Sequence, residues 1–175
     1  MTLELVLERG FDDVTLVEIS DAAGVSRSTY LRYVGSKAEA VVGGLMSVGN
    51  QIAQRLRERP SDESDWIALR RAFDAITEAH GTNAQRLLQL VESVRTNPGL
   101  SGSLALQRDQ WRDVIAEAAV ARRPETSPRQ AQARAAAALA ALDVAVIEWS
   151  DSSGRERFEA ALDAAFDAVG TASNH

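Results

Sequence analysis

The chain has 175 residues, a formal net charge of −6 at pH 7 and no cysteine, a length that suits one or two compact domains. The absence of cysteine excludes a disulfide framework and thiol chemistry, and the two histidines lack the spacing of metal ligands. No apolar run reaches the length of a membrane span and the N-terminus does not resemble a signal peptide, so we expect a cytoplasmic protein without a membrane partner.

The sequence also lacks the motifs of common enzymes. It contains no phosphate-binding glycine-rich loop and no Gly-x-Ser-x-Gly turn. Its carboxylates are scattered over polar helix faces, where solvation explains them better than acid–base chemistry does. We therefore expect no catalytic activity, no metal and no cofactor.

Apolar residues recur at helical spacing along the whole chain. The first helix carries Leu3, Val6 and Leu7 on one face, and Gly10 ends it. Short helices are predicted at 15–23 and 27–34. Longer ones are predicted at 37–59, 66–80, 82–96, 104–122, 128–149 and 158–169. This pattern predicts nine helices without a strand, which is an all-α fold.

Residues 15–37 carry the features of a helix-turn-helix. Thr15 and Glu18 form a capping box at the start of one helix, Gly24 allows a tight turn, and Ser26 caps a second helix. Ser20 is small at the point where the two helices must cross. In such a motif the second helix enters the major groove of DNA.

The second helix and the residues beside it present side chains that suit DNA. Residues 26–37 contain three basic residues, the last of them Lys37, and no acidic residue. Arginine reads guanine, hydroxyls meet bases or phosphates, and a lysine beside the helix N-terminus at Ser36 can bind phosphate. An ordinary helical hairpin with a solvated basic face is the alternative. The residues that we expect to contact DNA are Thr15, Ser26, Arg27, Ser28, Thr29, Leu31, Arg32, Tyr33 and Lys37.

The order GF-x3-T-x3-I-x3-AGVS-x2-T-x2-RY-x2-SK, over residues 10–37, resembles the DNA-binding domain of the TetR family of transcriptional regulators. The resemblance implies a nine-helix TetR-like fold with a three-helix DNA-binding head at 1–44 and a helical domain for ligand sensing and dimerisation at 45–175. The family usually has a buried Leu followed by a DNA-facing Tyr, whereas this chain has Tyr30-Leu31, so we expect Tyr30 to point inward and Leu31 to face DNA. The family's first helix normally begins before the position of Met1, and we expect numbering from an internal Met.

In the long helix after Lys37, Gly43, Gly44 and Gly49 each weaken the helix by about 1 kcal/mol relative to Ala. Two explanations remain open. The glycines make a pliable connector, or they allow close packing against a neighbouring helix.

The second half of the chain carries bulky aromatic residues on several helices, which line an apolar pocket or fill a core. The stretch QRDQWRD resembles the C-terminal domain of the mycofactocin-cluster regulator subgroup, which implies an apolar or acyl-type effector. The candidate pocket residues are Trp66, Phe73, His80, Glu92, Arg95, Trp111 and Trp149.

The last two helices have more apolar residues than one bundle edge needs, and in the family they form the dimer interface. The candidate interface residues are Leu139, Leu142, Val146, Leu162, Phe166 and Val169. We expect a homodimeric regulator, a repressor, that binds a palindromic double-stranded DNA operator and is released by a small effector. The alternative is an all-helical adaptor that binds protein and has no DNA activity.

Overall fold

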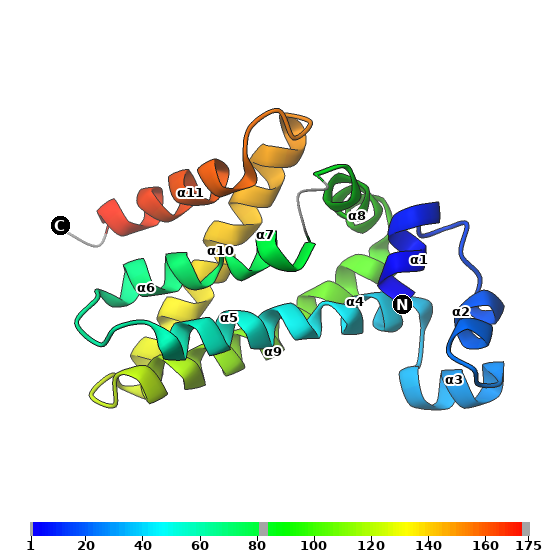
Figure 1. The fold of residues 1–175 in the computed structure, drawn as a ribbon, viewed down its shortest axis with the longest axis horizontal. Helices are drawn as coiled ribbons and strands as arrows, with labels where there is room; N and C mark the ends of the chain where they lie inside the picture. Colours follow the sequence, from blue (N-terminus) through cyan, green and yellow to red (C-terminus); the bar gives the residue numbers. More distant parts are fainter. Residues whose placement is uncertain (1, 81–83, 173–175) are drawn as a thin grey trace. The chain divides into compact units, whose positions relative to one another are not determined.

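The computed structural model describes residues 2–80 and 84–172, and every regular element in these ranges is an α-helix (Figure 1). The all-α fold class is therefore confirmed. The helices are α1 Thr2–Arg9, α2 Leu16–Ala22, α3 Arg27–Val34, α4 Lys37–Gly44, α5 Met46–Glu58, α6 Asp65–Ala72, α7 Ala75–His80, α8 Ala84–Thr96, α9 Pro98–Arg122, α10 Pro128–Asp151 and α11 Phe158–Ala172.

The nine expected helices correspond to these eleven because two of them are interrupted. The helix expected at 37–59 is divided at Leu45, whose N–H donates to the carbonyl of Val42 at 2.9 Å. The helix expected at 66–80 is divided at Phe73, which is fully buried. Each interruption adds a tight turn without ending the run of helix along the chain.

The described residues form two compact units, one from 2–47 and 84–107 and the other from 48–80 and 108–172. In the first unit α1 packs on α4 and α8, α2 packs on α3, and α3 packs on α4. Its core includes Val6, Val14, Ile19, Val41 and Leu100, each at most 2% exposed. The division at residues 44–45 into a DNA-binding and a sensing domain concerns function and stays a prediction.

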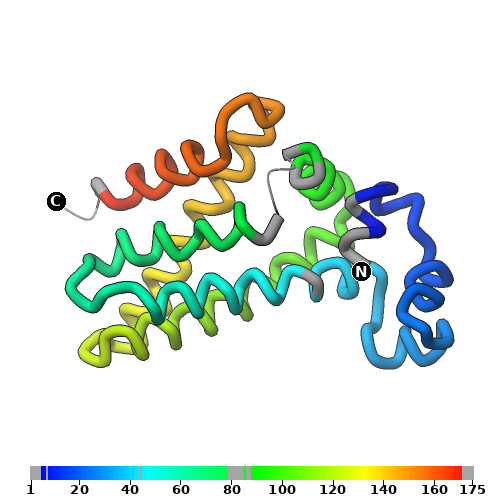
Figure 2. Tube along the Cα trace, viewed as in Figure 1, coloured from blue at the N-terminus to red at the C-terminus, as the bar shows by residue number. Residues whose placement is uncertain are grey.

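In the second unit α10 lies along α11, and both pack on α6 (Figure 2). Ser127 is the N-cap of α10: its hydroxyl accepts from the N–H of Gln130 at 3.3 Å, and Pro128 takes the first turn. The alanines of α10 allow close packing, since Ala131, Ala135 and Ala138 are at most 1% exposed.

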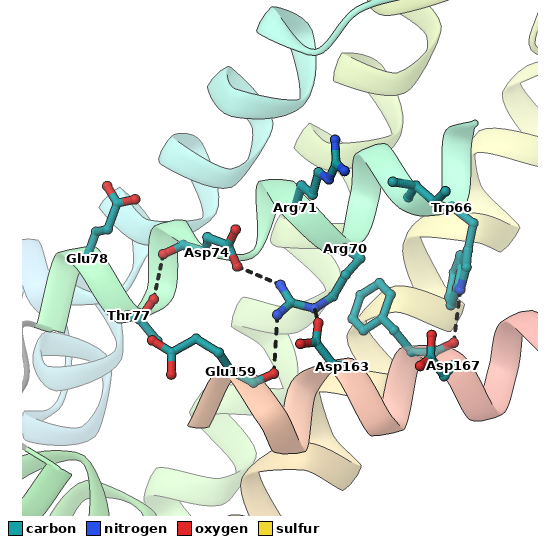
Figure 3. Close-up of a pocket in the computed structure, with 11 residues that line it drawn as sticks. Trp66, Arg70, Arg71, Asp74, Thr77, Glu78, Glu159, Asp163 and Asp167 are labelled. Atoms are coloured by element: carbon teal, nitrogen blue, oxygen red, sulfur yellow. Dashed lines mark hydrogen bonds and ion pairs between the residues drawn. The ribbon is translucent and has the colours of Figure 1, made fainter. Parts of the chain in front are cut away.

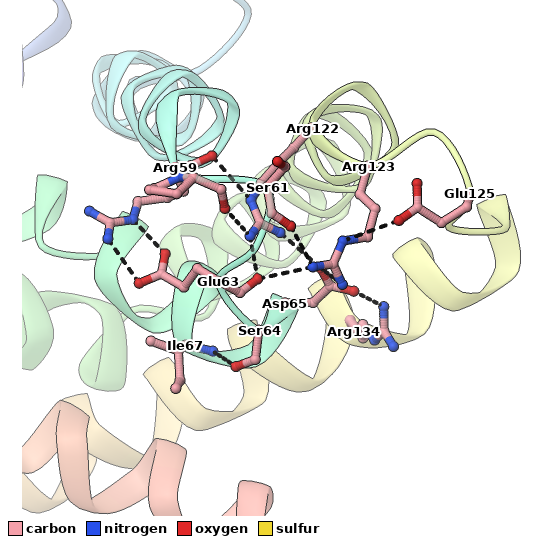
Figure 4. Close-up of polar contacts among 11 residues, drawn as sticks. Arg59, Ser61, Glu63, Ser64, Asp65, Ile67, Arg122, Arg123, Glu125 and Arg134 are labelled. Carbon is pink, nitrogen blue, oxygen red and sulfur yellow. Dashed lines mark hydrogen bonds and ion pairs between the residues drawn. The ribbon is translucent and has the colours of Figure 1, made fainter.

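One buried arginine fixes the loop between α5 and α6 (Figure 4). The side chain of Arg122, at the end of α9, is 2% exposed. Its guanidinium donates to the carbonyls of Arg59, Pro60 and Glu63 and, at 2.8 Å, to Oδ1 of Asp65. A buried charge requires such a complete set of partners. Arg123 also donates to the carbonyls of Ser61 and Glu63, at 2.7 and 3.1 Å, so two arginines tie the loop to the end of α9.

Candidate nucleic-acid interface

The turn between α2 and α3 has the geometry that the sequence predicted. Gly24 has φ +68°, in the left-handed region that glycine adopts cheaply. The N–H of Val25 donates to the carbonyl of Ser20 at 3.0 Å. Ser20 is 1% exposed, and its hydroxyl donates to the carbonyl of Leu16 at 2.6 Å. A small, internally bonded residue at the crossing lets the two helices approach closely.

The start of α2 is held by a capping box and an ion pair. The N–H of Thr15 donates to Oε2 of Glu18 at 2.8 Å, and the N–H of Glu18 donates to the hydroxyl of Thr15 at 3.2 Å. Arg9 Nη1 donates to Oε1 of Glu18 at 2.7 Å. These bonds lower the pKa of Glu18 from 4.5 to about 2. The bond from the backbone N–H of Thr15 has the largest effect, followed by the bonds from the Thr15 hydroxyl and from Arg9. The Thr15 hydroxyl is thus engaged within the chain, and its contact with DNA stays a prediction.

The start of α3 uses the hydroxyls that we expected to face DNA. Ser26 accepts from the N–H of Thr29 at 3.2 Å, which makes it the N-cap. Its Oγ also donates to the Thr29 hydroxyl at 2.9 Å and lies 3.0 Å from the Ser28 hydroxyl. Arg27, between them, is exposed. The guanidinium of Arg27 is therefore the long polar group that the start of α3 presents to solvent.

The outer surface of α3 is partly apolar. Tyr30 is 7% exposed and belongs to the core, whereas Leu31 is 37% exposed, so this pair has the orientation that its reversed order predicted. Tyr33 is 76% exposed, and the guanidinium of Arg32 lies 4.9 Å from its ring centroid. Val25 is 37% exposed as well, because it precedes the N-cap and is not yet helical.

Lys37 has a different surrounding from the one expected. Its ammonium donates to the carbonyls of Phe11 and, at 2.8 Å, of Val14, and it lies 4.2 Å from the ring centroid of Phe11. The lysine therefore ties the connection between α1 and α2 to the start of α4. This internal role was not expected, and the phosphate contact that we assigned to Lys37 stays a prediction.

The aromatic residues assigned to a ligand pocket occupy three separate places in the second unit. Trp66 and Phe73 both contact Phe166, with ring centroids 4.8 and 5.5 Å apart. Trp149 contacts a different ring, that of Phe158, at 5.6 Å. The ring of Trp111 lies under the guanidinium of Arg108, whose central carbon is 5.0 Å from the ring centroid. Phe73, Trp111 and Trp149 are core residues, whereas Trp66 is half-buried. Their assignment to a ligand pocket stays a prediction.

The polar residues assigned to the pocket come from two different parts of the chain. Glu92 and Arg95 are exposed on α8, which belongs to the other unit. His80 is the last residue of α7, and its side chain lies outside the described residues. The assignment of these three residues to a pocket stays a prediction.

A hollow of about 580 Å³ opens between α6, α7 and α11, and Trp66 is on its wall (Figure 3). Arg70 crosses it, donating to Asp163 and to Asp74 at 2.6 Å each. Five carboxylates and two guanidiniums line the hollow, which makes it acidic and unlike the apolar pocket we expected. Its lining residues are Trp66, Ile67, Arg70, Arg71, Asp74, Thr77, Glu78, Glu159, Asp163, Phe166 and Asp167.

Most residues assigned to a dimer interface lie inside the chain's own core. Leu139, Leu142, Leu162 and Phe166 are between 0% and 6% exposed. These side chains are therefore covered by the chain's own helices, and their role in a dimer interface stays a prediction. Val146 and Val169 are half-buried.

The exposed apolar residues of α10 are instead Val144 and Ile147, at 48% and 51%. They lie three residues apart and so share one face of the helix. Neither residue is among those that we assigned to a dimer interface from the sequence, although their helical spacing was available as a signal.

No group of three or more potential metal ligands occurs among the described residues. By length and mean hydropathy alone, α10 could span a membrane, contrary to our expectation that no segment would. Its composition explains this result: it is rich in alanine, which is mildly apolar, and it packs against α11 and α6.

A capped short helix, a glycine turn and a second helix with an exposed, acid-free basic surface define a helix-turn-helix protein of the DNA-binding class. Comparison with known proteins gives the family. Residues 1–41 match the family described as "Bacterial regulatory proteins, tetR family", and residues 63–174 match "MftR C-terminal domain". The chain belongs to the TetR family of bacterial transcriptional regulators.

Two relatives agree with this assignment. The HTH-type transcriptional regulator TcmR of Streptomyces glaucescens is 25% identical over 126 residues, which cover 69% of this chain and 56% of that protein. The chain thus spans little more than half the length of this curated relative. A solved structure from Rhodococcus sp., described as a TetR-family transcriptional regulator, matches with a TM-score of 0.58 at 16% sequence identity. The match covers 97% of this chain and 93% of that one. That likeness shows the shared fold.

Proposed function

We propose that the chain is a ligand-responsive repressor that binds a palindromic operator as a homodimer in the cytoplasm and leaves it when a small apolar or acyl-type effector binds. The observation that carries the proposal is the α2–α3 motif, whose second helix presents Arg27 and Arg32 with no carboxylate between Ser26 and Lys37. A local basic surface suffices for DNA binding in a protein of net charge −6. Family membership supports DNA binding over the adaptor hypothesis.

The homodimer is supported by the exposed face of α10 with Val144 and Ile147. On α11, Ala160, Ala164 and Ala168 are exposed at four-residue spacing and would let a second copy approach closely. A two-fold dimer presents two copies of α3, which matches two half-sites about one helical turn of DNA apart.

The effector class is supported by the match to the MftR C-terminal domain and by the three tryptophans of the second unit. Effector binding would favour a spacing of the two heads that no longer fits the operator. The coupling is reciprocal: if the effector weakens operator binding by some factor, the operator weakens effector binding by the same factor.

The experiment that tests the proposal is a gel shift of the full chain on the DNA upstream of its own gene, with and without long-chain acyl compounds. We expect a sequence-preferring complex that these compounds dissociate, together with quenching of tryptophan fluorescence. Compounds that quench the fluorescence but leave DNA affinity unchanged would contradict the sensing role. Absence of a preferred DNA sequence would contradict the regulator itself.

A further inference from the structure

The exposed surface of α3 contains one apolar side chain among polar ones. Leu31 is 37% exposed, although a leucine in a small head would ordinarily be part of the core. The neighbouring Tyr30, at 7%, fills the inner position instead. Leu31 therefore points outward because its neighbour occupies the core, and its isobutyl group is available on the surface.

Leu31 shares its helix face with Arg27 and Ser28, which precede it by four and three residues. All three are exposed. The hydroxyl of Ser28 already lies 3.0 Å from that of Ser26, the N-cap of α3. A long cation and an apolar group are thus the two features that this face offers to a ligand.

Each feature has one natural partner in the major groove. A guanidinium pairs with O6 and N7 of guanine, and the only apolar group among the base edges is the C5-methyl of thymine. We propose that Leu31 determines specificity by packing on a thymine methyl, beside the guanine that Arg27 reads. The inference rests on the proposed DNA-binding function and names the base that one of its residues recognises.

Helix geometry limits where the thymine lies. Positions four residues apart on a helix are separated by about 6 Å along its axis. Successive base pairs are about 3.4 Å apart along each strand. The thymine should therefore lie within about two base pairs of the guanine in each half-site.

The test uses a preferred site obtained by in vitro selection with the full chain. Each thymine of the site is replaced in turn by deoxyuridine, which lacks only the C5-methyl. Wild-type protein should lose affinity about fourfold per half-site at one position near the guanine, the value for about 0.8 kcal/mol of lost methyl burial. The Leu31→Ala variant should bind the thymine and deoxyuridine sites equally well.

Ile67→Ala is the matched control, because Ile67 is an exposed apolar residue, at 48%, on α6 of the other unit. It should keep the full sensitivity to deoxyuridine. If Leu31→Ala keeps that sensitivity too, or if no thymine position is sensitive in the wild type, the inference is overturned while DNA binding stands. If selection yields no preferred site, the proposed function fails and this inference fails with it.

Discussion

The indole of Trp111 occupies the space that a side chain at position 49 would need. A Cβ on Gly49 would lie 2.8 Å from Cγ of Trp111, closer than real Cβ atoms approach a ring. Trp111 is 4% exposed, and Gly49 belongs to α5 of the same unit. Of the two explanations for the glycines of this region, close packing applies at this position.

We therefore expect Gly49→Ala to lower the free energy of unfolding. Overpacking a buried site costs about 1–3 kcal/mol, whereas the gain from replacing Gly by Ala in a helix is about 1 kcal/mol. Urea denaturation followed by circular dichroism measures the difference. Gly43→Ala is the control, since nothing lies within 4 Å of a Cβ there, and it should raise the free energy of unfolding. A change of the same sign in both variants would contradict the packing role of Gly49.

Lys37→Met should destabilise the fold without changing the salt dependence of DNA binding. The substitution removes the donors to the carbonyls of Phe11 and Val14, and hydrogen bonds from charged groups contribute about 1.5–3 kcal/mol. Chemical denaturation gives the stability, and gel shifts at several salt concentrations give the slope. If the plot of log affinity against log salt concentration were less steep by about one for the variant, Lys37 would contact a phosphate.

Arg27→Ala should weaken DNA binding and leave the stability of the fold almost unchanged. An exposed side chain of this kind affects stability by at most about 0.5 kcal/mol. Loss of a base contact should cost about 1–3 kcal/mol of binding and relax the preference at one base pair. Repeating the site selection with the variant measures this. Equal weakening on every sequence would place Arg27 on the phosphate backbone instead.

Protonation of Glu18 should weaken the head at low pH. The pKa of Glu18 is lowered in the folded chain, from 4.5 to about 2, so its protonated form favours the unfolded state. Ionised Glu18 therefore stabilises the folded chain fully above about pH 4.5, and this stabilisation is lost as the pH falls through about 2. Urea denaturation between pH 2 and 6 should show that the free energy of unfolding depends less on pH in Glu18→Gln than in the wild type. Asp21→Asn, an exposed carboxylate of the same helix, is the matched control. Identical pH profiles for Glu18→Gln and the wild type would refute the effect.

Ile147→Asp should convert the proposed dimer to a monomer, because it puts a charge on the exposed apolar face of α10. Light scattering at micromolar concentration measures the mass, and Ile67→Asp on α6 should leave it unchanged. Leu142→Ala should instead reduce stability by about 2–5 kcal/mol, since Leu142 is 2% exposed within the chain. A stable dimer of the Ile147→Asp variant would place the interface elsewhere.

Features that depend on neighbouring residues in the chain could be predicted from the sequence. The caps at Thr15, Ser26 and Ser127 and the turn at Gly24 are such features, because their partners lie within a few residues. The reversed burial of Tyr30 and Leu31 followed from helix periodicity in the same way.

Features that depend on distant partners could not be predicted. Lys37 meets carbonyls more than twenty residues earlier in the chain, and its position beside a helix start suits a phosphate equally well. Periodicity places Leu142 and Ile147 on apolar stripes of one helix. It cannot tell which stripe the chain's own helices cover, because that depends on how α11 and α6 pack on α10.

The attachment of the α5–α6 loop by Arg122 bears on protein engineering. The loop is short and polar, and such segments are the usual choice for inserting a reporter peptide. Here the carbonyls of Arg59, Pro60 and Glu63 all accept from one guanidinium that is almost completely buried. A peptide inserted after Ser61 would pull some of those carbonyls away and leave the buried guanidinium with Asp65 as its main partner, and loss of hydrogen-bond partners around a buried charge is costly. A fluorescent biosensor based on this chain should therefore carry its label elsewhere.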